Sequence, residues 1–361
     1  MPPVTVLVLF PELAHDAGPL VRALDAALVT LAERHRTGFL AAGAAEVVIR
    51  REPPDDTPFG ARLRRLVDEL RPTGLVVLGA GAIPLADEAD RRAFVAAAAD
   101  DDGDAGARAL ANNRYSADVV AIARARETLA TLPDLPTDNA LPRWLASAGI
   151  HVRDLARRRH LAVDVDTPLD LALLAGLPGI PALPDGLADE VTDRRRALRS
   201  LATDAGAELL VAGRTSAADL RWLERHTACR IRALVEERGL RTSAASALSG
   251  RPNRRAPRSV LGLLLDPDGP ASLGDHVAAL AEGALIDSRV LLAHREGAHE
   301  RRWPPAEDRY ASDLLLADRV ADPWLAALTR GAAAAPVPII LGGHTLVGPA
   351  LRNALGSRKH A

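Results

Sequence analysis

The chain has 361 residues, of which 48% are hydrophobic, so it is long enough for two domains with apolar cores. Lysine and arginine number 45 against 47 aspartates and glutamates. This balance disfavours nucleic acid or an anionic membrane surface as the main partner. The single cysteine, Cys229, excludes an internal disulfide and a cysteine-based zinc site. We therefore expect a cytoplasmic protein, without signal peptide or membrane span.

Strand and helix patterns alternate along the first 99 residues. Continuous apolar runs predict buried strands, and apolar residues at helical spacing predict the intervening helices. The order β-α-β-α-β-α indicates a doubly wound sheet with right-handed crossovers. The expected strands cover 4–10, 46–49 and 74–78, and the expected helices cover 20–42, 59–70 and 91–99.

An acidic stretch at 100–106 then interrupts the pattern and predicts a solvated loop. Beyond it, the sequence predicts short strands at 107–111, 118–123, 151–155 and 160–164, a helix at 139–148 and another from Thr167. We assign residues 1–183 to one domain, and we interpret the charged helix within 184–205 as a connector.

The remaining residues, 206–361, predict a second and smaller α/β domain of unknown role. The segment 241–258 is rich in Ser, Ala, Arg and Pro, which is typical of a flexible loop. Strands are expected at 208–211, 259–265, 286–292 and 337–341, and helices from 217 and at 272–283, 310–330 and 345–355. Cys229 is expected on a helix as a core residue.

Two aspartates close the apolar segment 160–166. On a strand, Asp164 and Asp166 would point to one face, at the carboxyl end where open α/β sheets bind ligands. Two carboxylates there could hold Mg²⁺, which prefers oxygen ligands and substrate phosphates. Thr167, Pro168 and Asp170 by themselves are explained by the start of a helix, with Thr167 as its cap.

The run DVDTPLDL at 164–171 resembles the Asp-x-Asp-Thr-Pro-x-Asp-Leu segment of GT-A-type nucleotidyltransferases. The nearest families are the 2-phospho-L-lactate guanylyltransferases, and the molybdenum-cofactor nucleotidyltransferases are more distant. The segments 74–95, 109–122 and 135–155 are similar to family segments in the same order. The resemblance covers about residues 1–180, and it implies a GT-A-like doubly wound mixed sheet.

The resemblance also implies an activity and a set of site residues. The activity is Mg²⁺-dependent transfer of a nucleotide from a purine triphosphate to a small phosphorylated acid or cofactor precursor, with release of pyrophosphate. Asp164 and Asp166 would be the catalytic metal ligands. Asn112 and Asn113 would orient the acceptor or the base, although asparagines there also favour turns. The backbone at Gly79 and Gly81 would face the nucleotide. The sequence leaves the oligomeric state open and is compatible with a homo-oligomer.

Two departures from the family pattern favour an alternative function. No Gly-rich or lysine-containing triphosphate loop follows the first strand, and the segment GAGAIPL at 79–85 lacks the family's first metal-binding aspartate. Asp87 and Asp118 are the carboxylates that could replace it. The alternative is a catalytically degenerate domain that binds a metabolite or acts as a scaffold.

The second half contains three weaker candidate features. The loops at Arg214 and at His344 each follow a strand and precede a helix, which is typical of an anion site or of ordinary helix capping. A third hypothesis places an independent catalytic site at the His344 loop. Asp266, Asp287 and His294 lie near expected strand ends, where an Asp/His metal cluster is conceivable.

Overall fold

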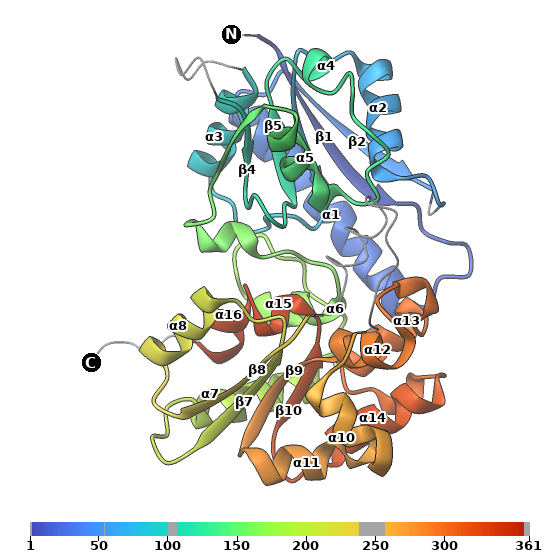
Figure 1. Cartoon of the computed structure of the whole chain (residues 1–361), viewed down its shortest axis with the longest axis vertical. Coiled ribbons are helices and arrows are strands. Elements are labelled where there is room, and N and C mark those ends of the chain that lie inside the picture. The colour runs from blue at the N-terminus through green and yellow to red at the C-terminus, as the bar shows by residue number, and fades with distance from the viewer. Residues whose placement is uncertain (1, 54, 100–106, 238–256, 357–361) are drawn as a thin grey trace. The chain divides into compact units, whose positions relative to one another are not determined.

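The computed structural model describes residues 2–53, 55–99, 107–237 and 257–356 (Figure 1). The chain forms two compact units, and neither is a single stretch of sequence. The first unit comprises residues 1–16, 25–166 and 178–181, and the second comprises 17–24, 167–177 and 182–361. The loop predicted at 100–106, and nearly all of the one predicted at 241–258, lie outside the described residues.

The first unit is built on a mixed sheet of six strands in the order β2-β1-β3-β5-β4-β6. β1 pairs in parallel with β2 and β3, whereas β5 is antiparallel to both β3 and β4. The continuous apolar runs of β1 and β3 are explained by burial on both faces of the sheet. The strands are β1 (Val4–Pro11), β2 (Glu46–Glu52), β3 (Gly74–Gly79), β4 (Ala107–Ala111), β5 (Val119–Ile122) and β6 (His151–Asp154).

Helices cover both faces of this sheet. Alternate residues of β1 show the division, because Val6 and Val8 pack with α1 and α3 while Leu7 packs with α2 and α5. The predicted stripe on α2 is confirmed, with Leu63 and Leu66 fully buried. The helices are α1 (Pro19–Ala41), α2 (Phe59–Leu70), α3 (Glu88–Ala99), α4 (Ala125–Thr128) and α5 (Leu141–Ser147).

The second unit has a sheet of four parallel strands in the order β10-β9-β7-β8. The strands are β7 (Glu208–Gly213), β8 (Arg230–Val235), β9 (Gly283–Asp287) and β10 (Ile339–Gly342). One apolar core joins the sheet to the helices around it. These helices are α6 (Pro168–Leu174), α7 (Asp189–Leu201), α8 (Ala217–His226), α10 (Val260–Asp268), α11 (Leu273–Leu280), α12 (Ser288–Glu296), α13 (Ala306–Asp313), α14 (Pro323–Ala334), α15 (His344–Val347) and α16 (Leu351–Leu355).

The helix α7, expected as a connector, packs within the second unit. Val191 and Leu198 lie in its apolar core. Arg194 donates hydrogen bonds to the carbonyl oxygens of Ala332 and Ala333. These contacts tie α7 to the end of α14, so the helix is part of a folded layer.

Several predictions of local structure are wrong. The segment 259–265, expected as a strand, begins the helix α10, where Ser259 caps the helix by accepting from the Gly262 N–H. The strand expected at 286–292 ends at Asp287 and continues as the helix α12. A single helix at 310–330 is instead the separate helices α13 and α14. Short apolar runs fit a buried helix as well as a buried strand, which explains the first two errors.

Cys229 does not lie on a helix, because α8 ends at His226 and β8 begins at Arg230. The cysteine is buried, as predicted, and contributes to the core of the second unit. Burial raises the pKa of its thiol above the usual value. A raised pKa keeps the thiol protonated and unreactive at neutral pH. No helix in the described ranges is both long and apolar enough to cross a membrane.

Candidate functional site

A cavity of about 350 Å³ opens at the carboxyl ends of β1 and β3 in the first unit. β1 leads to β2 on one side and lies beside β3 on the other, so the strand order reverses at this point. Open α/β sheets bind ligands beside such a reversal, because the loops leaving the two strands diverge there. The cavity is lined by Leu9, Phe10, Pro11, Glu52, Thr57, Phe59, Arg62, Val77, Leu78, Gly79, Ala117, Asp118, Val120, Pro136, Thr137, Asp138 and Leu141.

One wall of the cavity carries an ion-pair network. Glu52, at the end of β2, is buried and accepts a hydrogen bond from Arg65. The Nε atom of Arg62 lies 3.8 Å from a Glu52 carboxylate oxygen, and its Nη2 atom lies 3.0 Å from Asp55. The carboxylates hold the Arg62 side chain in place beside the cavity. A guanidinium group fixed in this way is positioned to donate hydrogen bonds to a ligand.

Asp118 contributes a carboxyl group with a strongly raised pKa to the cavity. It precedes β5, and its side chain accepts a hydrogen bond of 2.9 Å from the Asn112 amide. Burial is the main cause that raises the pKa of Asp118 to about 7; the hydrogen bond from Asn112 opposes the rise, and the charges of Asp138 and Asp166 add to it. The group is therefore poised to exchange a proton, or to bind a cation, near neutral pH.

Asn112 is buried, and its side chain is fully used within the chain. Its amide nitrogen donates to Asp118 and, at 2.8 Å, to the Leu161 carbonyl. Its oxygen accepts from the Asp118 N–H at 3.0 Å. The asparagine predicted to orient a ligand thus positions Asp118, while Asn113 accepts from the Tyr115 N–H and forms a turn.

The two glycines predicted to face a nucleotide have different surroundings. Gly79 lines the cavity, and a Cβ atom placed there would meet only the Leu9 carbonyl oxygen, at 4.0 Å. A Cβ atom on Gly81 would lie 2.2 Å from the Val165 carbonyl oxygen. Gly79 is open to a ligand, whereas Gly81 is needed for the close approach of two backbone segments.

The strand expected at 160–164 does not form. Residues Arg159–Ala162 are a 3₁₀ turn, and Asp164 makes a single bridge to Ala82. The Val165 N–H donates to the Gly81 carbonyl at 2.9 Å, so this segment is held by the loop after β3 and joins no ladder. Neither Asp164 nor Asp166 lines the cavity, but the charge of Asp166 reaches Asp118 and raises its pKa.

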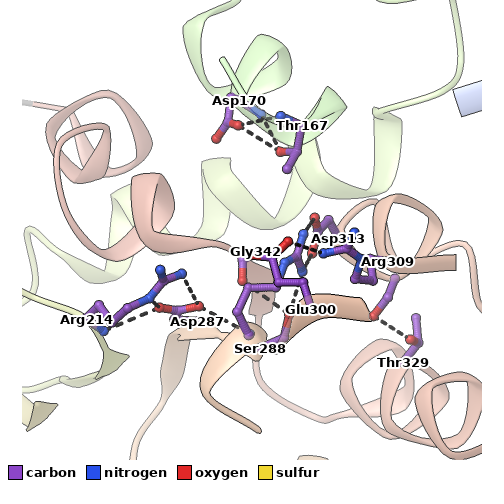
Figure 2. Close-up of polar contacts among 12 residues, drawn as sticks. Thr167, Asp170, Arg214, Asp287, Ser288, Glu300, Arg309, Asp313, Thr329 and Gly342 are labelled. Carbon is purple, nitrogen blue, oxygen red and sulfur yellow. Dashed lines mark hydrogen bonds and ion pairs between the residues drawn. The ribbon is translucent and has the colours of Figure 1, made fainter. Parts of the chain in front are cut away.

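The helix start predicted after Asp166 is confirmed in the second unit. Thr167 and Asp170 form a reciprocal capping box at the beginning of α6 (Figure 2). The Asp170 carboxylate accepts from the Thr167 N–H at 2.8 Å. Thr167, Pro168 and Asp170 of the Asp-Thr-Pro signature therefore have a structural role, as predicted from the sequence.

At the start of α3, the carboxylate of Asp87, the other candidate metal ligand, accepts from the Asp90 N–H, and the Asp90 carboxylate accepts from the Asp87 N–H. Asp90 is buried and also accepts from Arg158 and His160, both at 2.6 Å. Asp87 is absent from the lining of the cavity. Its position is that of a helix cap.

Across the part of the chain that the structure describes, no group of three or more His, Cys, Asp or Glu side chains is arranged to hold a metal ion. The structure does not bring Asp266, Asp287 and His294 together as one cluster. His294 lies 3.2 Å from Asp266, and Asp287 is paired with Arg214 instead. A metal in the first unit would need ligands from its substrate in addition to Asp118 or Asp166.

Phe10, Glu52 and Arg62 are among the cavity residues that the sequence analysis did not single out. Glu52 had a weak signal, because it is a charged residue shortly after the predicted strand 46–49, which the structure extends to Glu52. Phe10 looks like an ordinary strand residue, and Arg62 looks like one solvated charge on an amphipathic helix. Only the pairing of β1 with β2 and β3 brings them to one cavity.

Removing the Asp118 charge is expected to change how stability depends on pH. Its folded-state pKa of about 7 exceeds the usual 3.8, so the folded state binds this proton more tightly than the unfolded state. Stability is therefore lost as pH rises from about 4 to about 7, by at most ~1.4 kcal/mol per pH unit. The Asp118→Asn variant does not undergo this loss, so its stability relative to that of the native protein should increase between about pH 4 and about pH 7. Urea unfolding in EDTA at pH 5 and pH 8 measures the difference, and an equal difference at both pH values would contradict the assigned pKa.

No protein-family model and no curated protein sequence matches the chain.

Proposed function

We propose that the first unit is a nucleotidyltransferase-like domain that binds a purine nucleoside triphosphate in the cavity at β1 and β3. It would transfer the nucleotide to a small phosphorylated acid or cofactor precursor and release pyrophosphate. The observation that carries the proposal is the cavity at the strand reversal, with Asp118 at its wall. Its volume of about 350 Å³ lies within the range of small-molecule sites.

The lining supports a division of roles. Phe10, Phe59 and Leu141 offer apolar contact area of the kind that a nucleobase needs. Arg62 is the cation of the lining and would attract a phosphate group. Gly79 leaves room for a ligand to approach the backbone of β3. Asp118, held by Asn112, lines this volume directly before β5.

The residues present fit a Mg²⁺ ion that takes most of its ligands from substrate phosphates and water, as is usual for this ion. Asp118, at the wall of the cavity, would be one protein ligand, and Asp166, which lies outside the lining but whose charge reaches Asp118, would be the second. When bound, the ion would neutralise charge on the phosphates. Asn112 would keep the Asp118 carboxylate oriented, and Arg62 would hold a second anionic group of the substrate.

The alternative function, binding without catalysis, is favoured by one observation. The two asparagines expected to orient the acceptor already bond within the chain, so this family-like segment contributes no free amide at Asn112. A domain that retains the cavity but lacks acceptor contacts would bind a nucleotide and hold it unchanged.

The test is a thermal-unfolding screen of the full chain with GTP, ATP, CTP and UTP, each with and without Mg²⁺. A ligand at 100 times its dissociation constant stabilises by about 2.7 kcal/mol, which gives a clear shift. We expect a shift with a purine triphosphate and Mg²⁺, and its loss in Asp118→Asn and Asp166→Asn. Asp68→Asn, on the exposed face of α2, is the matched control.

Pyrophosphate release then separates the two functions. Release in the presence of a phosphorylated hydroxy acid, abolished by Asp166→Asn, supports transfer. A nucleotide shift without release in any acceptor mixture supports the binding domain. The absence of any shift would exclude both.

A further inference from the structure

The sheet of the second unit has its own point of strand reversal, between β7 and β9. β7 pairs with β8 on one side and with β9 on the other, and β10 lies beyond β9. All four strands are parallel, so their carboxyl ends share one edge. At this point β7 ends at Gly213 and β9 ends at Asp287. Arg214 directly follows β7. Ligand sites of open parallel sheets form beside such a point.

Arg214 is held rigidly at this edge. Its Nε and Nη2 atoms donate to the two carboxylate oxygens of Asp287, at 2.5 and 3.0 Å (Figure 2). Asp287 is buried, and the Arg214 charge is the main influence that outweighs burial and lowers the pKa of this carboxyl. A Cβ atom on Gly213 would lie 2.3 Å from the Asp287 Cβ, so this glycine permits the close contact.

The pairing with Asp287 leaves the Nη1 atom of the guanidinium group for another partner. The Nη1 atom of Arg214 makes no hydrogen bond or ion pair with the residues in the described ranges. Its side chain is 19% exposed, whereas the Asp287 side chain is 0% exposed. A fixed, partly exposed arginine is preorganised to bind an oxyanion, because little side-chain entropy is lost when the anion binds.

A second, independent observation comes from the next residue. Thr215 is 6% exposed, and its hydroxyl has no hydrogen-bond partner in the part of the chain that is described. A buried hydroxyl without a partner costs about 1–3 kcal/mol, so native proteins keep few of them. A bound molecule that supplies the missing partner would recover this cost.

The His344 loop reaches the same edge from β10. Gly342, at the end of β10, pairs with Asp287, so His344 follows the partner of this carboxylate by two residues, and its charge lowers the pKa of Asp287. A Cβ atom added to the preceding residue, Gly343, would meet no atom within 4 Å, so there is open space beside this loop. The two loops that the sequence singled out separately therefore border one carboxylate.

We propose that Arg214, Thr215 and His344 form a second ligand site, which binds the oxyanion group of a small metabolite. The anion would accept from Arg214 Nη1 and from the Thr215 hydroxyl, and the imidazole of His344 would border it. Asp287 would position Arg214 without touching the ligand. The site is independent of the function proposed for the first unit.

Isothermal titration of the full chain with inorganic phosphate, at constant ionic strength, tests the proposal. We expect millimolar binding that weakens about fivefold in Thr215→Val, since one neutral hydrogen bond contributes about 1 kcal/mol. This substitution removes only an unpaired hydroxyl, so the variant should fold. Arg214→Lys keeps a cation beside Asp287 but loses the planar fork, and we expect a loss of tenfold or more. Arg221→Ala, exposed on α8, is the control.

Arg62→Ala distinguishes this site from the cavity of the first unit. Phosphate binding that survives Arg62→Ala and weakens about fivefold in Thr215→Val supports the second site. Binding that fails only in Arg62→Ala, binding unaffected by Thr215→Val and Arg214→Lys, or no binding at all would overturn the proposal. Nucleotide binding in the first unit stands or falls separately, through Asp118→Asn.

Discussion

Replacing Asp313 with asparagine is expected to lower the free energy of unfolding by about 3–5 kcal/mol, because it leaves a buried charge without its partner. Asp313 accepts two hydrogen bonds from Arg289, of 2.7 and 2.6 Å, and both side chains are buried. Burial disfavours the charged guanidinium, but the carboxylate outweighs it and raises the pKa of Arg289. Arginine also stays charged without this partner, because its ordinary pKa lies far above neutral pH.

Urea unfolding of the full chain measures this effect, and Asp193→Asn is the control. Asp193 and Arg196 form an exposed pair of 2.8 Å, whose loss should cost less than about 1 kcal/mol. A double variant, Arg289→Met with Asp313→Leu, should recover most of the stability, since it removes both buried charges. An Asp313→Asn variant as stable as Asp193→Asn would show that the buried pair contributes little.

Gly81→Ala is expected to destabilise the first unit by roughly 3 kcal/mol. The added methyl group would lie 2.2 Å from the Val165 carbonyl oxygen, and backbone cannot move aside as a flexible side chain can. The bond from the Val165 N–H to the Gly81 carbonyl would be strained as the segments separate. Asp166 follows this contact directly, so the substitution should also weaken Mg²⁺-dependent nucleotide binding.

Gly79→Ala is the matched comparison, two residues away on the same segment. Its methyl group would meet only the Leu9 carbonyl oxygen at 4.0 Å, so stability should change little. Because Gly79 lines the cavity, the methyl group should reduce nucleotide affinity without unfolding the domain. Thermal unfolding with and without nucleotide separates the two variants. Equal loss of stability in both would refute the close contact assigned to Gly81.

The sequence predicted those elements whose local pattern and tertiary surroundings agree. β1 and β3 are continuous apolar runs with both faces buried, and α2 carries one clear apolar stripe. The start of α6 was readable because Thr167 and Asp170 cap the helix through contacts only three residues apart. A short, continuous apolar run such as 259–265 fits a buried helix and a buried strand equally well, so its secondary structure is decided by packing against the rest of the protein.

The candidate site was predictable only in part, for the same reason. Asp118 could be named as a candidate carboxylate, and Gly79 as a residue open to a ligand, because each flanks a predicted strand. Glu52, Arg62 and Phe10 enter the cavity only when β1 pairs with β2 and β3. That pairing joins segments about 40 to 70 residues apart in the sequence. Local sequence patterns do not predict which segments pair across such a separation.

By itself, the sequence determined the α/β class of both units, the principal strands and helices of the first, and the capping of α6. These depend on hydrophobic periodicity and on hydrogen bonds between near neighbours. The tertiary structure alone decided that Asn112 positions Asp118, that Arg214 pairs with Asp287, and where the two strand reversals lie. Strand order and the pKa of a buried carboxyl depend on contacts between distant segments, because burial and neighbouring charges exist only after the chain has folded.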